Sequence, residues 1–329
     1  MGRDSVLRVA VQFPTEITRL DEERKVTFKQ ISFHLMSFVL CLACSGPTAF
    51  AGETAPAKQG SPQLLTLIVM DPLAAPLSCP CVKGYAQRDY EKLGAYLEKE
   101  LGRKVEVKFS ESLAKAVPEK ANNRAYLIIG KQSVVLADAG ALKLKVQGVA
   151  RLSDLKGSTT QTGLIVVPAK DPAQTAKDLQ GYRIFFGPSE CDEKHQAAMN
   201  ILKKAHVSIP KKLEISEACS DGACKILEFD KDVRAAAVIS SYAKPLLQGC
   251  GTIKKGDLRV VAETKPVPFI TAFTGGKMNA AEQKEISTAL MNVVTQPELC
   301  QSLESLLGFV TLENPVGSSQ PKTAALKKK

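Results

Sequence analysis

The sequence has 329 residues, which is enough for about two domains, and 44% of them are hydrophobic and 24% charged, as in an ordinary soluble globular protein. The formal net charge is +10, but part of this excess lies in the last residues of the chain, and no basic stripe interleaved with aromatic residues occurs elsewhere. We therefore expect no nucleic-acid partner and interpret the charge as an aid to solubility or to contact with a membrane surface.

The N-terminal segment, residues 1–51, is predicted to be an export signal. The apolar run at residues 31–44 has about the length of a signal-peptide core and is too short to span a bilayer comfortably. Basic residues precede this run, and Ala49-Phe50-Ala51 supplies a small-x-small pattern for cleavage after Ala51. A lipoprotein site at Cys44 and an uncleaved anchor are the alternatives. The segment predicts a periplasmic location for the rest of the chain.

Strands and helices then alternate along the first half of the chain. Short apolar or alternating runs predict strands, whereas apolar residues repeating at helical spacing predict helices. After a Pro/Gly-rich linker at residues 52–62, the predicted order is a strand at 63–70, a loop at 72–84, a helix at 88–102, a strand at 104–109, a short helix from 111 that is interrupted at Pro118, a strand at 125–131, and extended runs at 144–152 and 162–171.

The same pattern restarts in the second half. The predicted order there is a turn and strand at 178–187, a helix at 192–207, a strand at 212–218, a helix at 223–233, a strand at 234–247 that passes into a loop or helix, an extended run at 258–274, helices at 280–295 and 296–309, and a disordered basic tail at 313–329. Such alternation predicts an α/β architecture with largely parallel sheets. Extended crossings at 158–168 and 257–274 predict two lobes joined by a two-strand hinge, with lobe 1 at 63–160 plus 265–312 and lobe 2 at 161–264.

One helix start, in the stretch GPSECDEKH at residues 187–195, carries an unusual set of side chains. A helix N-terminus attracts anions, yet this one gathers Glu190, Asp192 and Glu193. Cys191 and His195 are four residues apart and would share one face of a continuous helix. The acids would repel a phosphate dianion and favour a cation, or they simply complement the helix dipole and face water.

The order of these signals resembles the periplasmic substrate-binding proteins of ABC transporters with the type 2 fold, and specifically the phosphate/phosphite/phosphonate-binding family. The resemblance covers nearly all of the mature chain and is carried by YEKLGAYLEKELGRKVEV, AYLIIGKQSVV, DLQGYRIFFGPSE, RAAAVISSYA and LRVVAETKPVPF. It implies two lobes, each a mixed, mostly parallel sheet flanked by helices, joined by a two-strand hinge. It also implies a small oxyanion held in the cleft, an ABC permease or a membrane sensor as partner, a monomer, and no enzymatic activity.

The resemblance also implies where the ligand residues lie. The hydroxyl-rich loop of the family falls on Ser189 and Cys191, and its cleft strand ends at Ser240, Ser241 and Tyr242. Ser133 lies where the family has a tyrosine after its third strand, and the family's histidine falls near Cys224. Most of the side chains that contact a phosphonate in the family are therefore replaced.

Cysteines occupy several of the replaced positions. If the strand-to-helix loops converge, one cleft presents Cys79, Cys81, Cys191, His195 and Cys224, a set that suits Cu(I) or Zn(II). In an oxidising compartment the alternatives are a disulfide between Cys219 and Cys224, a disulfide from the Cys-Pro-Cys segment to Cys191 across the cleft, or inert thiols. The alternative function is accordingly a periplasmic soft-metal-binding or redox-responsive protein on the same scaffold, and a structural protein of the cell envelope is the third hypothesis.

Overall fold

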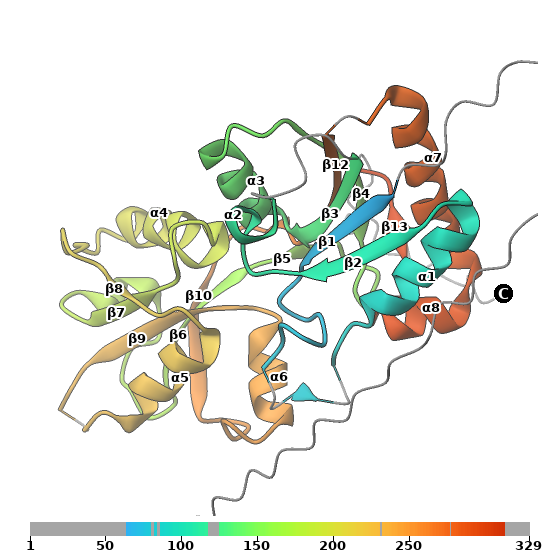
Figure 1. The fold of residues 1–329 in the computed structure, drawn as a ribbon. Coiled ribbons are helices and arrows are strands. Elements are labelled where there is room, and N and C mark those ends of the chain that lie inside the picture. The colour runs from blue at the N-terminus through green and yellow to red at the C-terminus, as the bar shows by residue number, and fades with distance from the viewer. Residues whose placement is uncertain are drawn as a thin grey trace, which may run out of the picture. The chain divides into compact units, whose positions relative to one another are not determined.

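The computed structural model describes residues 64–312, except 80–81, 84–85, 118–124, 231 and 277. These residues form two lobes, each built around one mixed β-sheet (Figure 1). The predicted signal peptide, linker and C-terminal tail lie outside the described residues. Within the described ranges, no helix has the length and apolar character needed to cross a bilayer.

Lobe 1 contains a six-stranded sheet. Its strands, in sheet order, are β13 (Phe309–Val310), β4 (Val146–Leu152), β12 (Ile270–Gly276), β3 (Ala125–Lys131), β1 (Leu65–Met70) and β2 (Val105–Phe109). β1 pairs in parallel with β2 and β3, whereas β12 is antiparallel to β3 and β4, and β13 is antiparallel to β4. Since β1 has neighbours on both edges and helices on both faces, its sequence LTLIVM is apolar almost throughout.

Helices cover both faces of the lobe 1 sheet. They are α1 (Tyr90–Leu101), α2 (Leu113–Ala116), α3 (Gln132–Ala141), α7 (Ala280–Met291), η5 (Asn292–Thr295) and α8 (Pro297–Ser302). α1, α7 and α8 pack on one face, and α2 and α3 pack on the other. α1 begins where the Asp89 carboxylate accepts hydrogen bonds from two backbone N–H groups, and it ends at Gly102, whose φ of 59° is left-handed.

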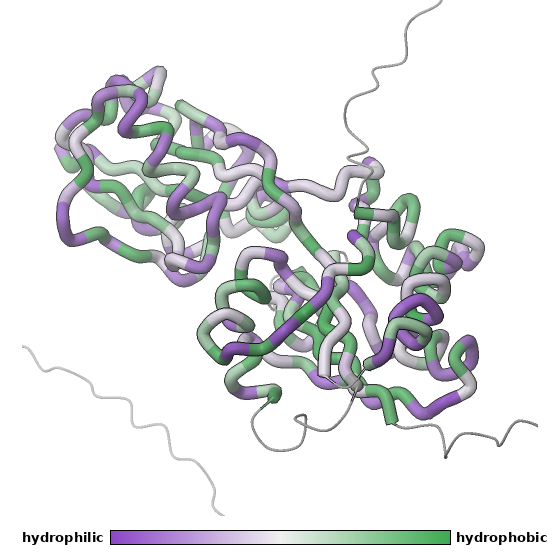
Figure 2. The backbone as a smooth tube through the Cα atoms, turned by 90° about the horizontal axis from the view of Figure 1, so that it is seen from above, coloured by the Kyte–Doolittle hydropathy of each residue, from purple (hydrophilic) through white to green (hydrophobic). Residues whose placement is uncertain are grey.

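Lobe 2 contains a five-stranded sheet. Its strands, in sheet order, are β10 (Leu258–Glu263), β6 (Gly163–Pro168), β9 (Ala235–Ser240), β7 (Arg183–Phe186) and β8 (Glu214–Ile215). Its helices are η3 (Ala176–Leu179), η4 (Asp192–Lys194), α4 (Gln196–Lys204), α5 (Cys219–Glu228) and α6 (Ala243–Gly249). η3 and α4 pack on one face of this sheet, and α5 and α6 pack on the other. Figure 2 shows hydrophobic segments inside each lobe and hydrophilic segments at its outside.

Two short strands lie where the chain passes between the lobes. β5 (Thr160–Gln161) pairs antiparallel with β11 (Val267–Pro268) in a two-stranded sheet of its own. One strand leads into β6 of lobe 2, and the other leads from β10 back to β12 of lobe 1. This pair is the two-strand connection that the extended crossings predict.

The two-lobed α/β architecture agrees with the prediction, but some details differ. Two of the five pairings in the lobe 1 sheet and two of the four in the lobe 2 sheet are parallel, so neither sheet is mostly parallel. α3 lies between two predicted strands, where no helix was predicted. The helix predicted at 192–207 is divided into η4 and α4 at His195, whose φ and ψ of −116° and −90° are not helical.

Candidate functional site

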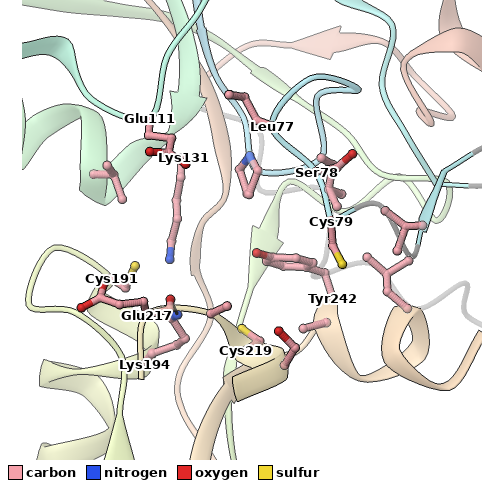
Figure 3. A pocket seen from close by; sticks show the side chains of 18 of the residues that line it. Leu77, Ser78, Cys79, Glu111, Lys131, Cys191, Lys194, Glu217, Cys219 and Tyr242 are labelled. Carbon is pink, nitrogen blue, oxygen red and sulfur yellow. Dashed lines mark hydrogen bonds between the residues drawn. The ribbon is translucent and has the colours of Figure 1, made fainter. Parts of the chain in front are cut away.

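A pocket of about 340 Å³ lies between the two lobes (Figure 3). Lobe 1 lines it with residues at or after the ends of β1, β2 and β3, and lobe 2 lines it with residues that follow β7, β8 and β9. In open α/β sheets, ligands bind at the carboxyl ends of parallel strands, and both lobes contribute such ends here. The lining residues are Met70, Pro72, Leu73, Leu77, Ser78, Cys79, Val82, Glu111, Lys131 and Val134 from lobe 1, and Cys191, Lys194, Glu217, Ala218, Cys219, Ser220, Tyr242, Ala243, Leu246 and Leu247 from lobe 2.

A buried ion pair joins the lobes at this pocket. Lys131, the last residue of β3, donates from Nζ to Oε1 of Glu193 in η4 at 2.7 Å. The two side chains are 6% and 0% exposed, and Ser240 at the end of β9 donates to the same oxygen at 2.6 Å. Burial opposes the charge on Lys131, but the charge of Glu193, its hydrogen bond and the nearby Cys191 together outweigh burial and hold the pKa of Lys131 above its ordinary value.

The turn that carries Glu193 packs directly against two glycines, Gly163 and Gly187. A β-carbon on Gly163 would overlap the carbonyl oxygen of Glu193, and one on Gly187 would overlap the side chain of Lys194. Gly187 N also donates to the Lys194 carbonyl at 3.1 Å. Only glycine allows this approach, so the two residues fix where the turn presents its side chains. The other Glu193 carboxylate oxygen, Oε2, is buried without a hydrogen-bond partner among the described residues.

Lys194 is a buried cation that lines the pocket. The residue is 4% exposed, and its Nζ donates to the Glu217 carbonyl at 3.4 Å. None of the ion pairs in the described part of the chain joins Lys194 to a carboxylate. Removing an ammonium group from water costs several kcal/mol unless a counter-charge offsets it. This geometry suits an anion in the pocket.

An internal network anchors the loop that forms the lobe 1 wall. Asp71 follows β1, is fully buried, and pairs with the Arg88 guanidinium at 2.8 Å. Its carboxylate also accepts from the Tyr90 hydroxyl at 2.5 Å and from the Leu73 N–H at 2.8 Å. Burial and the charge of Asp71 raise the pKa of Tyr90 well above its ordinary value, so Tyr90 stays a donor. The bonds of Asp71 therefore fix the N-terminal end of the loop at residues 72–79, which forms the lobe 1 wall of the pocket.

Three cysteines line the pocket, namely Cys79, Cys191 and Cys219 (Figure 3). Burial raises the pKa of Cys191 above its ordinary value, although the ammonium groups of Lys131 and Lys194 lower it. The Cys191 thiol is therefore protonated at neutral pH. Cys219 accepts a hydrogen bond from the Ser240 N–H at 3.4 Å.

The predicted metal site is not assembled. Cys79 and Cys191 line the pocket, but Cys224 and His195 do not, and Cys81 lies outside the described residues. The helix is divided at His195, and Nδ1 of its ring donates to the Gly187 carbonyl at 2.7 Å. Among the residues that the structure describes, no group of three or more His, Cys, Asp or Glu side chains could hold a metal ion.

The predicted Cys219–Cys224 disulfide is wrong. α5 begins at Cys219 rather than at residue 223, so both cysteines lie in one helix and both are free thiols. Five helical residues separate them by about 7.5 Å along the axis, which is too far for a disulfide. Cys191 is also a free thiol and forms no bridge across the cleft.

Of the six predicted ligand residues, the structure places Cys191 and Tyr242 at the pocket. Ser240 lies behind the wall, where it binds Glu193, and Ser241 accepts a hydrogen bond from Thr162 N in the inter-lobe connection. Ser189 is exposed and donates to Glu190. The Ser133 hydroxyl, on the first turn of α3, is buried without a partner among the described residues, and its neighbour Val134 lines the pocket instead.

Sequence reasoning missed Lys131 and Lys194. The acids of the 187–195 stretch suggested a cation site, but Glu193 faces Lys131 inside the protein, and the charged residue of this stretch that lines the pocket is Lys194. The signals available were a lysine that ends a fully apolar strand and two glycines, Gly163 and Gly187, that mark a close backbone approach.

Comparison with known proteins identifies the family. The model of the family described as "ABC transporter, phosphonate, periplasmic substrate-binding protein" matches residues 84–315, well over half of the chain. No curated protein sequence matches the chain. The structure resembles PhnD1 from Prochlorococcus marinus in complex with methylphosphonate (TM-score 0.56, 13% identity, 76% of this chain and 93% of that one).

Two further solved structures have the same fold. One is a binding protein component of an ABC phosphonate transporter from Pseudomonas aeruginosa (TM-score 0.56, 11% identity, 76% of this chain and 81% of that one). The other is XAC2383 from Xanthomonas citri bound to ATP (TM-score 0.57, 13% identity, 78% of this chain and 93% of that one). The predicted type 2 fold and the predicted family are both confirmed. The chain belongs to the family of periplasmic substrate-binding proteins of phosphonate ABC transporters.

Proposed function

We propose that this chain is exported to the periplasm, captures a small anion in the pocket between its lobes, and delivers it to an ABC permease. The observation that carries the anion site is Lys194, a buried ammonium group at the pocket wall with no carboxylate partner among the described residues. A bound anion supplies the missing counter-charge, and because Lys194 is buried the attraction is stronger than between two exposed charges.

Two other features support this function. The family to which the chain belongs serves ABC transporters, and the fold relatives hold methylphosphonate in one case and ATP in another. The connection between β5 and β11 joins the lobes where hinge bending would open the pocket for loading. In this proposal the mature protein begins at Gly52, acts as a monomer and closes lobe 1 onto lobe 2 around its ligand.

Isothermal titration calorimetry tests the proposal directly. The purified chain is titrated with phosphate and with methylphosphonate, and the measurement is repeated with Lys194→Met, which keeps an unbranched side chain and removes the charge. The matched control is Lys92→Met on α1, an exposed lysine outside the pocket. We expect binding that Lys194→Met weakens by at least about tenfold and that Lys92→Met leaves unchanged.

Two outcomes contradict the proposal. Anion binding that survives Lys194→Met places the anion elsewhere. A chain recovered from the producing cell with an intact N-terminus and in the cytoplasmic fraction contradicts export, and N-terminal mass spectrometry of the fractionated cell measures this.

A further inference from the structure

The buried groups at the pocket, Lys131, Glu193 and Lys194, together carry one net positive charge. Lys131 is neutralised by Glu193 at 2.7 Å, which leaves Lys194 as the buried cation without a carboxylate among the described residues. The two acids in the lining, Glu111 and Glu217, are exposed, and Glu111 pairs with Lys115 at 3.5 Å. A ligand with one negative charge balances this pocket, whereas a dianion would leave a second charge facing Glu193 and the acidic rim.

Apart from the hydroxyl groups of Ser78, Ser220 and Tyr242, the remaining walls are mostly apolar. Leu73, Leu77, Val82 and Val134 face the pocket from lobe 1, and Leu246 and Leu247 face it from lobe 2. Tyr242 adds an aromatic ring that stacks on Phe269 at 4.9 Å, and its hydroxyl points into the pocket in Figure 3. The three thiols behave as small, weakly polar groups. The walls thus offer three hydroxyl groups and Lys194 to the oxygens of a phosphonyl group, and a larger apolar surface to a hydrocarbon.

We propose that the ligand is an organic monoanion with a hydrocarbon body, whose single charged group meets Lys194 and whose body lies against the leucine and valine walls. This inference rests on the proposed function, since it names the class of anion that the same pocket takes. A volume of about 340 Å³ is at the lower end of the range for small-molecule sites. It holds on the order of ten non-hydrogen atoms, taking about 30 Å³ for each.

A series of ligands with similar tails tests the inference. Octanoate carries one charge and a hydrocarbon tail, octylphosphonate carries a tail one carbon longer with a second ionisable proton, and methylphosphonate carries the head group with a single methyl group. By calorimetry we expect octanoate to bind at least about tenfold more tightly than methylphosphonate. We expect octylphosphonate to bind more tightly in mildly acidic buffer, as a monoanion, than in alkaline buffer, as a dianion.

Two variants locate the binding. Lys194→Met should weaken octanoate by about a hundredfold, and Lys92→Met should not change it. Leu77→Ser on the lobe 1 wall should weaken octanoate several-fold and leave methylphosphonate unaffected, and it keeps the inference testable if Lys194→Met fails to fold.

The outcomes separate this inference from the proposed function. If methylphosphonate binds more tightly than octanoate and Lys194→Met still removes it, the ligand class is wrong and the anion site stands. If neither Lys194→Met nor Leu77→Ser changes the affinity for octanoate, the pocket is not the binding site and both proposals fail.

Discussion

Replacing Lys131 by methionine should destabilise the protein through the partner that it leaves behind. Lys131 and Glu193 lie 2.7 Å apart and are almost completely buried. At an effective dielectric constant of about 20, their attraction is roughly 6 kcal/mol. The cost of burying the two charges cancels much of this attraction, so the intact pair adds little net stability. Lys131→Met removes the attraction but keeps the cost of burying Glu193, and we expect a loss of about 3–5 kcal/mol.

Urea unfolding followed by circular dichroism measures this loss, because the chain has no tryptophan to report by fluorescence. The matched control is the double variant Lys131→Met with Glu193→Gln, which removes both charges and should recover most of the lost stability. The reasoning is refuted if the single variant loses under about 1 kcal/mol, or if the double variant is no more stable than the single one.

The same pair has a defined pH dependence. The pKa of Lys131 is raised above its ordinary value of 10.5 in the folded state. Its contribution to stability is therefore fully present below pH 10.5 and is lost as the pH rises through the folded-state pKa. Unfolding of the wild type relative to Lys131→Met, measured across this alkaline range, should show the gap between them closing.

Three further predictions concern other parts of the site. Gly163→Ala should destabilise the protein by about 2 kcal/mol or more, because the added β-carbon overlaps the Glu193 carbonyl. The control is Gly140→Ala in α3, where a β-carbon meets nothing within 4 Å, and this variant should stabilise the protein by about 0.5–1 kcal/mol. Equal effects in urea unfolding would contradict the close packing of the Glu193 turn against Gly163. Arg88→Met should cost about 3–5 kcal/mol by leaving Asp71 buried and unpaired, and thermal unfolding that matches the wild type would rule this out. Cys191 should react slowly with iodoacetamide below its ordinary pKa of 9.0, and a rate equal to that of the unfolded chain would show that burial does not protect the thiol.

The elements that sequence predicts well are those whose local pattern and buried environment agree. The strand at 63–70 and the helix at 88–102 match β1 and α1 closely, because the first is buried on both faces and the second has a capping aspartate and a terminal glycine. α3 was not predicted because its apolar residues form no clear stripe at helical spacing and its N-cap, Lys131, provides no side-chain cap. The helix predicted at 192–207 is divided because the turn that carries Glu193 packs closely against Gly163 and Gly187. This tertiary contact is not visible in the local sequence pattern.

The site was predicted less well than the fold. Tyr242, Cys79 and Cys191 were found because the resemblance and the converging strand ends put them at the cleft. Lys131 and Lys194 were missed since a lysine in a sequence is read as solvent-exposed, and burial becomes visible only when two segments about sixty residues apart are brought together. The acids of the 187–195 stretch led to the wrong prediction of a cation site for the same reason, because Lys131, the partner of Glu193, lies in the other lobe.

The close packing of the Glu193 turn against two glycines has a consequence for how the protein tolerates mutation. Because no space is left beside Gly163 or Gly187, nearly any larger residue at either position shifts Glu193 and Lys194 together. The leucines and valines that line the lobe 1 wall are not held in this way, so their side chains can vary in size one at a time. Substitutions that adapt this scaffold to new ligands should therefore accumulate on lobe 1. A saturation-mutagenesis map should show that the leucines and valines of the lobe 1 wall tolerate substitution and that Gly163 and Gly187 do not.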